Sequence, residues 1–281
     1  MHIKSIAQSP PNRRHHRGLV ADFVDARQRL GHYSFTDAEL AFSSAQTAVA
    51  RRAALGRLRR QGRVVRPLPR RRFFVIVPHE HHSLGAPPLS WYLDALMHFL
   101  GAADYYVGLL TAAQWHGASH FAVQETQVVV PRQLRPIRVG RERIRFITKA
   151  AAAATPVETR TLESGVIRIS TPEATAADLV RYPDAAGGLN LVATVLAELG
   201  GRLKPDALPA VFVHDADFAA AQRLGYLLDQ VGNARLTAPL ARWLARQRPR
   251  VRPLDPQAPV KGTVLNERWR LWVNATVETG L

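Results

Sequence analysis

The 281-residue sequence contains no cysteine. This absence excludes disulfides, thiolate nucleophiles, iron–sulfur clusters and every zinc site with cysteine ligands. Long apolar runs are also missing: no stretch approaches the roughly 18 residues that a membrane helix needs, so we expect no membrane association. The opening residues, MHIKSIAQSPPNRRHHRG, lack the apolar segment of a secretory signal, which predicts a cytoplasmic protein.

Acidic residues and lysine are scarce. Asp and Glu number 22 against 38 Lys and Arg, the formal net charge is +16, and only four of the 38 basic residues are lysines. A GC-rich genome explains most of the preference for arginine, although arginine also suits phosphate and guanine recognition. Codon usage does not explain why residues 1–78 hold 16 basic side chains and only four acidic ones.

A segment whose charges are nearly all positive indicates a polyanionic partner, most simply nucleic acid. The alternative partner, a membrane surface, would require an amphipathic helix with bulky apolar anchors. The basic stretch 51–63 supplies only two leucines, so we favour nucleic acid.

The length and the hydrophobic content of 47% suffice for two domains with packed cores. We expect a flexible basic tail over residues 1–18, a DNA-binding domain over 19–78, a linker over 79–90 and a C-terminal domain over 91–281.

Residues 19–78 show the order of a winged helix-turn-helix, three helices and then a β-hairpin. Hydrophobic spacing and helix-breaking residues place these elements over residues 19–30, 37–42, 45–61, 63–66 and 73–77. A generic three-helix bundle with a hairpin would show the same order. The arginines favour DNA binding, because they gather on the third helix and the hairpin tip. Arg51 falls on the inward stripe of the third helix, which leaves its phase open.

The predicted DNA contacts divide into two kinds. Gln46 and Thr47, early in the third helix, are expected at base edges, whereas the arginines are expected at phosphates or in the minor groove. The full candidate set is Thr36, Ser44, Gln46, Thr47, Arg51, Arg57, Arg60, Arg63, Arg70, Arg71 and Arg72.

The C-terminal part alternates between helical and strand-like patterns. Helices are predicted over 91–100, 105–115 and much of 172–247, including 215–230 and 235–247, with strand runs over 126–170 and a final strand over 268–274. The fold class is therefore α+β, with a mixed sheet-and-helix domain behind the winged helix. Arg138, Arg143 and Arg145 alternate with apolar residues, so that one strand face is basic. This face is either plain surface or a second polyanion site.

No catalytic constellation is present. The sequence has no phosphate-binding Walker loop and no nucleophile elbow, and His116 and His120 have the i, i+4 spacing without the glutamate of a zinc protease motif. A metal-dependent nuclease would need clustered carboxylates, and residues 142–173 offer only four scattered glutamates. We therefore expect no enzyme activity, no metal and no cofactor.

The segment STPEATAADLVRYP, residues 170–183, carries strong local signals. Thr171 or Ser170 is a helix N-cap, Pro172 takes the first helical position and Glu173 complements the helix N-terminus. Asp178 and Arg181 lie three residues apart on one face and can form an ion pair. We also expect Asp215 and Asp217 to cap the helix that follows them.

With the Gly187-Gly188-Leu189 that follows it, this segment resembles the signature of the AbiEi-type antitoxins of type IV toxin–antitoxin systems. Two other stretches are similar to that family, YVGLLTAAQWHG over residues 106–117 and a basic hairpin over residues 135–147. The resemblance implies motif residues His116, Arg145, Thr171, Glu173, Asp178 and Arg181.

The resemblance also implies a function in abortive infection. The winged helix would repress the protein's own operon by binding double-stranded promoter repeats, and the C-terminal domain would neutralise a nucleotidyltransferase-like toxin, with or without direct contact. The alternative is a winged-helix regulator whose C-terminal domain senses a ligand or dimerises.

Overall fold

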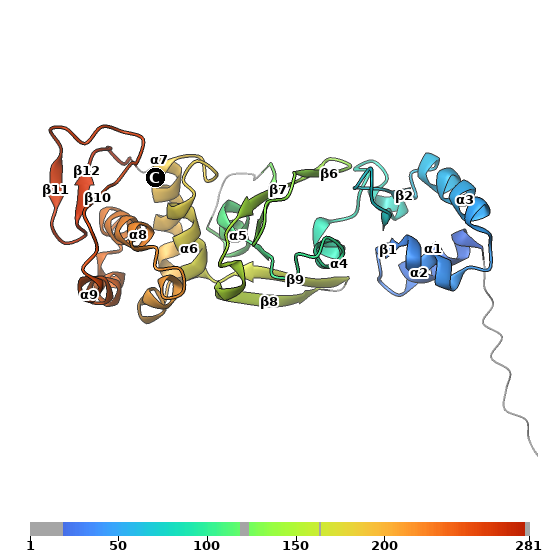
Figure 1. The fold of residues 1–281 in the computed structure, drawn as a ribbon, viewed down its shortest axis with the longest axis horizontal. Coiled ribbons are helices and arrows are strands. Elements are labelled where there is room, and N and C mark those ends of the chain that lie inside the picture. Colours follow the sequence, from blue (N-terminus) through green and yellow to red (C-terminus); the bar gives the residue numbers. More distant parts are fainter. Residues whose placement is uncertain (1–18, 119–123, 163, 279–281) are drawn as a thin grey trace, which may run out of the picture.

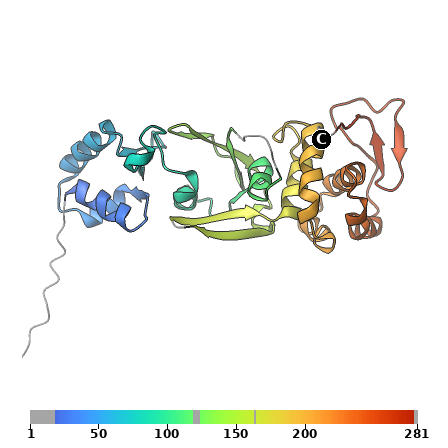
Figure 2. The ribbon, with the colours of Figure 1, turned by 180° about the vertical axis from the view of Figure 1, so that it is seen from behind.

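The computed structural model describes residues 19–118, 124–162 and 164–278 (Figure 1). The predicted tail over residues 1–18 and His120 lie outside the described residues. The elements follow one another along an elongated body, with the winged helix at one end and a small three-stranded sheet at the other (Figures 1 and 2). The α+β fold class is confirmed. None of the described helices is long and apolar enough to span a bilayer.

The predicted three helices and hairpin are present at the N-terminal end. Their bounds are α1 Val20–Arg29, α2 Asp37–Ser43, α3 Ala48–Arg60, β2 Val64–Val65 and β3 Phe73–Ile76. One strand, β1 Ser34–Thr36, was not predicted, because three residues are too few to show an alternating pattern. It pairs with β3, and the antiparallel strand order is β1-β3-β2.

Strand β3 is buried on both faces. Phe74 and Ile76 pack into the winged-helix core with residues of α1, α2 and α3. Phe73 and Val75 pack on the opposite side, in a second cluster with α4 (Leu93–Phe99) and the large sheet. The stretch 79–90 contains the 3₁₀ turn His79–His81 and contributes Ala86 and Leu89 to that second cluster. One strand therefore belongs to two cores.

The centre of the molecule is a six-stranded mixed sheet with the order β6-β7-β5-β4-β9-β8. Its strands are β4 Tyr106–Val107, β5 Thr126–Val130, β6 Ile137–Val139, β7 Glu142–Thr148, β8 Val157–Leu162 and β9 Gly165–Ser170. The prediction of one helix from residue 105 was wrong, because helix α5 begins only at Leu109. Tyr106 and Val107 form a central strand instead, since pairing with β5 and β9 outweighs the helical spacing.

Helices and a second small sheet form the rest of the chain. They are α6 Pro172–Arg181, α7 Leu189–Leu199, α8 Phe218–Gln230, α9 Ala238–Gln247, β10 Arg252–Pro253, β11 Val264–Asn266 and β12 Leu271–Val273. Helix α6 lies between the large sheet and the other helices (Figure 1). Every residue of α6 from Glu173 to Val180 is buried, so this helix is the central element of the domain.

Gly225 in α8 allows Trp269 to approach the helix. A Cβ atom at position 225 would lie 2.1 Å from Trp269 Cζ3, and Trp269 is fully buried. We expect Gly225→Ala to lower the free energy of unfolding by about 1–3 kcal/mol, because the indole must shift in a packed core. Thermal unfolding measures this effect. Gly201→Ala is the matched control, since a Cβ there meets nothing within 4 Å, and equal melting temperatures for the two variants would contradict the prediction.

Candidate nucleic-acid interface and motif site

Helix α3 and the wing tip carry arginines without acidic partners. The wing tip is the segment 67–72 between β2 and β3. Within the described residues, these arginines are exposed and form no ion pair: Arg52, Arg57, Arg59 and Arg60 of α3, and Arg70 and Arg71 of the wing tip. Because unpaired guanidinium groups keep their full positive potential, this surface is electrostatically suited to a polyanion.

The acidic side chains of residues 19–78 are engaged elsewhere. Asp37 pairs with Arg72 at 2.8 Å, Glu39 pairs with Arg27 at 3.3 Å, and Asp25 pairs with Arg63. Asp22 accepts a hydrogen bond from the Leu19 backbone N–H at 3.0 Å. Two predicted DNA contacts, Arg63 and Arg72, are therefore held in ion pairs, and the arginines of α3 are left unneutralised.

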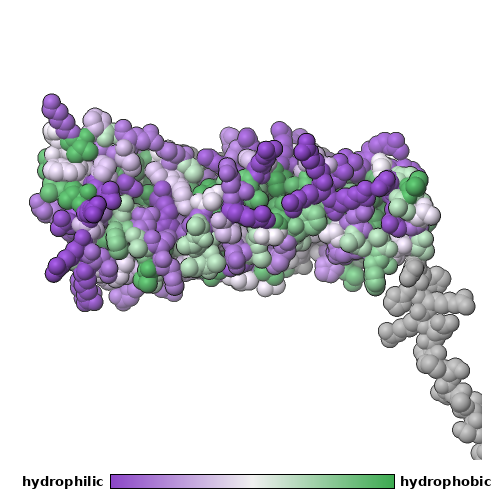
Figure 3. All heavy atoms as spheres, viewed as in Figure 1, coloured by the Kyte–Doolittle hydropathy of each residue, from purple (hydrophilic) through white to green (hydrophobic). Residues whose placement is uncertain are grey.

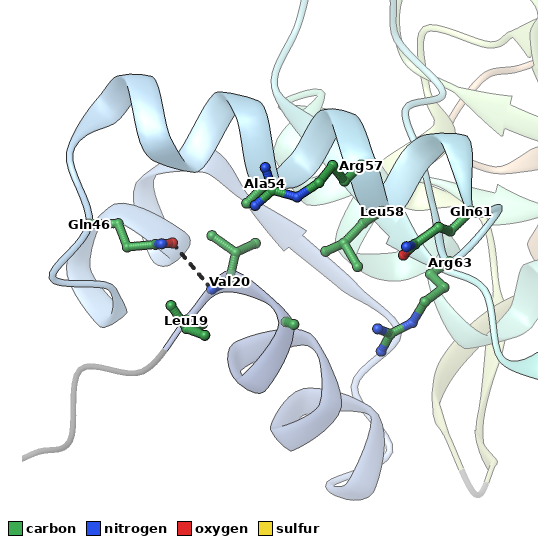
Figure 4. A pocket seen from close by; sticks show the side chains of 9 residues that line it. Leu19, Val20, Gln46, Ala54, Arg57, Leu58, Gln61 and Arg63 are labelled. Atoms are coloured by element: carbon green, nitrogen blue, oxygen red, sulfur yellow. Dashed lines mark hydrogen bonds between the residues drawn. The ribbon is translucent and has the colours of Figure 1, made fainter.

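The polar residues predicted near α3 build the turn that precedes it. The Thr47 hydroxyl accepts from the Ala50 N–H at 3.2 Å, so that α3 begins at Ala48 rather than Ala45. Ser44 is buried, and its hydroxyl accepts from the Gln46 N–H at 3.2 Å. Arg51 donates to the Gln46 carbonyl at 2.6 Å. The Gln46 side-chain oxygen accepts from the Val20 N–H at 3.4 Å and ties the turn to α1 (Figure 4).

The basic surface extends from α3 in two directions. Arg57 on α3, its C-cap residue Gln61 and the following Arg63 border a hollow of about 280 Å³ beside the start of α1 (Figure 4). On the other side, a groove of about 700 Å³ lies between the wing tip and β6, and its lining includes Arg70, Arg71, Arg135 and Arg138. Strongly hydrophilic side chains run along the upper part of this face from the large sheet to the winged helix, with hydrophobic residues among and below them (Figure 3).

The basic strand pair follows the predicted alternation. Ile137, Val139 and Ile144 are buried, whereas Arg138 and Arg143 are exposed. Arg143 forms an ion pair with Glu125 at 3.0 Å. Arg138 therefore adds positive charge beside the groove, whereas Arg143 is neutralised by Glu125.

A capping box at the start of α2 gives this end of the molecule a pH dependence. Burial by itself would raise the pKa of Glu39, but hydrogen bonds with Thr36 and the neighbouring Arg27 outweigh burial and hold that pKa below its ordinary value of 4.5. The stabilisation is therefore full above about pH 4.5 and is lost as the pH falls through the lowered pKa. We expect wild type to melt above Glu39→Gln at pH 7 and the difference to vanish under acid. A difference that is independent of pH would refute the assignment.

Asp178 is the centre of a buried charge network. It is fully buried on α6, its Oδ1 lies 3.1 Å from Lys149 Nζ, and its Oδ2 accepts from the Tyr106 hydroxyl at 2.7 Å. Lys149 is also buried. Burial, together with the carboxylate of Asp178, raises the pKa of Tyr106, so this phenol stays protonated as a donor. The network joins α6 to β4 and to the end of β7.

Arg181 extends the network to the segment before α8. The predicted Asp178–Arg181 pair is present at 3.8 Å, but the shorter ion pairs join Arg181 to Asp215 and Asp217, each at 2.7 Å. Burial would lower the pKa of Arg181, and the two carboxylates outweigh burial and raise it. Asp217 caps α8 through the Ala220 N–H, which confirms that part of the capping prediction. The role of Asp215 as an ion-pair partner was missed, because it lies far from Arg181 in the sequence.

The other motif residues are also bonded within the fold. Thr171 caps α6 through the Ala174 N–H, and Pro172 takes the first turn, as predicted. Glu173 accepts from the Lys204 N–H at 2.8 Å. The buried His116 places Nε2 2.8 Å from the Ser170 carbonyl, so it donates to the start of the motif.

Arg145 is the exception, since it is exposed on β7 and outside the network. The described residues contain no cluster of three or more His, Asp or Glu side chains that could hold a metal ion. The arrangement of the motif residues therefore fixes α6 against the sheet, and it offers no free nucleophile or acid–base pair.

Comparisons with known proteins agree with this fold. The crystal structure of the RV2827C protein from Mycobacterium tuberculosis superposes with a TM-score of 0.62, at 17% sequence identity, over 91% of this chain and 92% of that one. No curated protein matches the sequence. Residues 106–230, which contain the whole buried network, match the AbiEi antitoxin C-terminal domain. This match lies in the same part of the chain as the motifs that resemble the AbiEi-type antitoxins, so the comparison supports an AbiEi antitoxin C-terminal domain over residues 106–230.

Proposed function

We propose that this protein is a DNA-binding antitoxin of a type IV toxin–antitoxin system. Residues 19–78 would repress the protein's own operon, and residues 91–281 would neutralise a nucleotidyltransferase-like toxin. The match to the AbiEi antitoxin C-terminal domain supports the antitoxin role. The unpaired arginines of α3 and the wing tip carry the proposal of DNA binding.

The geometry suits a duplex. In a winged helix, the third helix enters the major groove and the wing lies against the adjacent backbone or minor groove. Arg57 and Arg60 on α3 and Arg71 at the wing tip then reach phosphates, which set position and affinity without reading sequence. The groove beside β6 continues this surface toward Arg138.

The test uses the full-length chain, because β3 contributes Phe73 and Val75 to the second core and a fragment without it would expose that core. The wild type and the variant Arg57→Ala/Arg60→Ala/Arg71→Ala are co-expressed with the neighbouring toxin gene under an independent promoter, and growth is measured. In parallel, a reporter driven by the operon promoter measures repression. We expect the triple variant to lose repression and to keep the rescue of growth.

Each other outcome has a definite meaning. Rescue that disappears together with repression, in a variant that is still folded by circular dichroism, would show that protection comes only from silencing the operon. Repression by the wild type without any rescue would favour the alternative regulator, whose C-terminal domain senses a ligand or dimerises. If the wild type shows neither repression nor rescue, the proposal is rejected.

A further inference from the structure

Helix α3 is built from only a few residue types. From Ala48 to Arg60 it consists only of alanine, valine, leucine, glycine and arginine. It therefore lacks the amides that bind adenine N6 and N7 and the carboxylates that accept from cytosine N4. Two kinds of direct base contact remain possible: arginine to guanine, and apolar contact with the thymine methyl group.

The polar residues before α3 do not supply the missing groups. The Gln46 side-chain oxygen is bonded to the backbone of α1, the Thr47 hydroxyl caps α3, and the Ser44 hydroxyl closes the turn. Each of these side-chain oxygens already accepts a hydrogen bond that positions the turn or the helix, so accepting from a base as well would compete with that bond. This arrangement favours readout by the side chains of α3 itself.

The outward face of α3 is apolar near its start. Val49, Arg52, Ala53 and Gly56 follow the i, i+3, i+4, i+7 spacing of one helix face, and the opposite face buries Ala54, Leu55 and Leu58. The Val49 side chain is 76% exposed. A bulky apolar group standing alone on a basic helix gains free energy only when a partner covers it.

We infer that α3 reads thymine through contact of the C5-methyl group with Val49 and Ala53, reads guanine through Arg52, and forms no direct hydrogen bond to adenine or cytosine. The inference rests on the proposed DNA-binding function and specifies its chemistry. Arg52 suits guanine because it is exposed, is unpaired within the described residues and lies on the same face as Val49.

The experiment measures binding to a duplex taken from immediately upstream of the protein's own gene. Each thymine is replaced in turn by deoxyuridine, which removes only the methyl group. At the contacted thymines we expect roughly fourfold weaker binding, the value of one buried methyl group. Replacement of guanine by 7-deazaguanine should weaken binding at the position of Arg52, because it removes the N7 acceptor. Replacement of adenines by 7-deazaadenine should change the affinity less than twofold.

Substitutions test whether Val49 causes the preference for thymine over deoxyuridine. Val49→Ala should reduce the preference for thymine over deoxyuridine at the position that Val49 contacts, whereas Val264→Ala should retain the fourfold preference. Val264 is the matched control, because its side chain is 75% exposed and lies in the C-terminal sheet. Both substitutions remove exposed side chains, so circular dichroism should show unchanged folding.

The outcomes distinguish the inference about base readout from the DNA-binding function on which it rests. Tight binding that is indifferent to every thymine methyl group, or that weakens with 7-deazaadenine, overturns the inference and leaves DNA binding intact. Absence of binding to this duplex and to unrelated duplexes at low salt rejects the DNA-binding function itself.

Discussion

Asp178→Ala is expected to be among the most damaging single substitutions in this protein, with a loss of about 3–5 kcal/mol in the free energy of unfolding. Lys149 is buried with its Nζ 3.1 Å from Asp178, and removal of the carboxylate leaves that ammonium group largely unneutralised in the interior. The Tyr106 hydroxyl also loses its acceptor. Urea unfolding followed by circular dichroism measures the loss, and Asp206→Ala, at an exposed position, is the matched control.

A double variant distinguishes the lost charge balance from the lost packing. Because the cost comes mainly from an unpaired buried cation, Lys149→Met combined with Asp178→Ala should be more stable than Asp178→Ala alone. A loss below 1 kcal/mol for Asp178→Ala would show that the network contributes little to stability, and a larger loss without recovery in the double variant would show that the cost comes from lost packing and hydrogen bonding. If Asp178→Ala is strongly destabilised and also loses antitoxin activity, the loss of activity reports misfolding and does not identify a contact with the toxin.

DNA affinity is expected to fall steeply with salt. With about five phosphate contacts, the slope of log K against log salt concentration is near −4 to −5, so binding weakens several-hundred-fold between 50 and 200 mM salt. Arg57→Ala/Arg60→Ala/Arg71→Ala removes three of these contacts and should make the slope shallower by about three. Fluorescence anisotropy over a salt series measures both values.

The control for this slope uses the same number of arginines at the other end of the molecule. Arg242, Arg246 and Arg250 are exposed on and after α9. Their triple alanine variant should leave the slope unchanged if the duplex lies on the winged helix. A flat salt response of the wild type, or equal slopes for the two triple variants, would contradict the assigned surface.

The local elements of the fold were predictable because their signals lie within a few residues. Thr36 and Thr171 each accept from a backbone N–H three residues ahead, and such caps can be recognised in sequence. The Thr47 cap was missed, because the helical spacing continued back to Ala45. Strands β5 and β6 lie in the region 126–170 where strands were predicted, since their apolar residues and turn breaks are local. Strand β4 was missed, because only its neighbours in the sheet keep Tyr106 and Val107 extended.

The candidate site was predictable in part for the same reason. The helical spacing predicted the pair Asp178–Arg181, but Lys149 and Asp215 are distant in sequence and carry no local signal of a shared site. Gln46 was misjudged for a related reason. The sequence places it next to the predicted recognition helix, but only the tertiary structure shows that its side-chain oxygen accepts from the backbone of α1.

Strand β3 has a mechanical consequence for the proposed DNA recognition. Since its two faces belong to two cores, the winged helix cannot swivel as a domain on a loose tether would. The angle between α3 and the face of β6 and β7 is therefore set before any duplex arrives, and little orientational freedom is lost on binding. A duplex that contacts both surfaces must match a fixed distance along its helix, so adding half a helical turn between the two contacts would place the second one on the wrong side of the DNA.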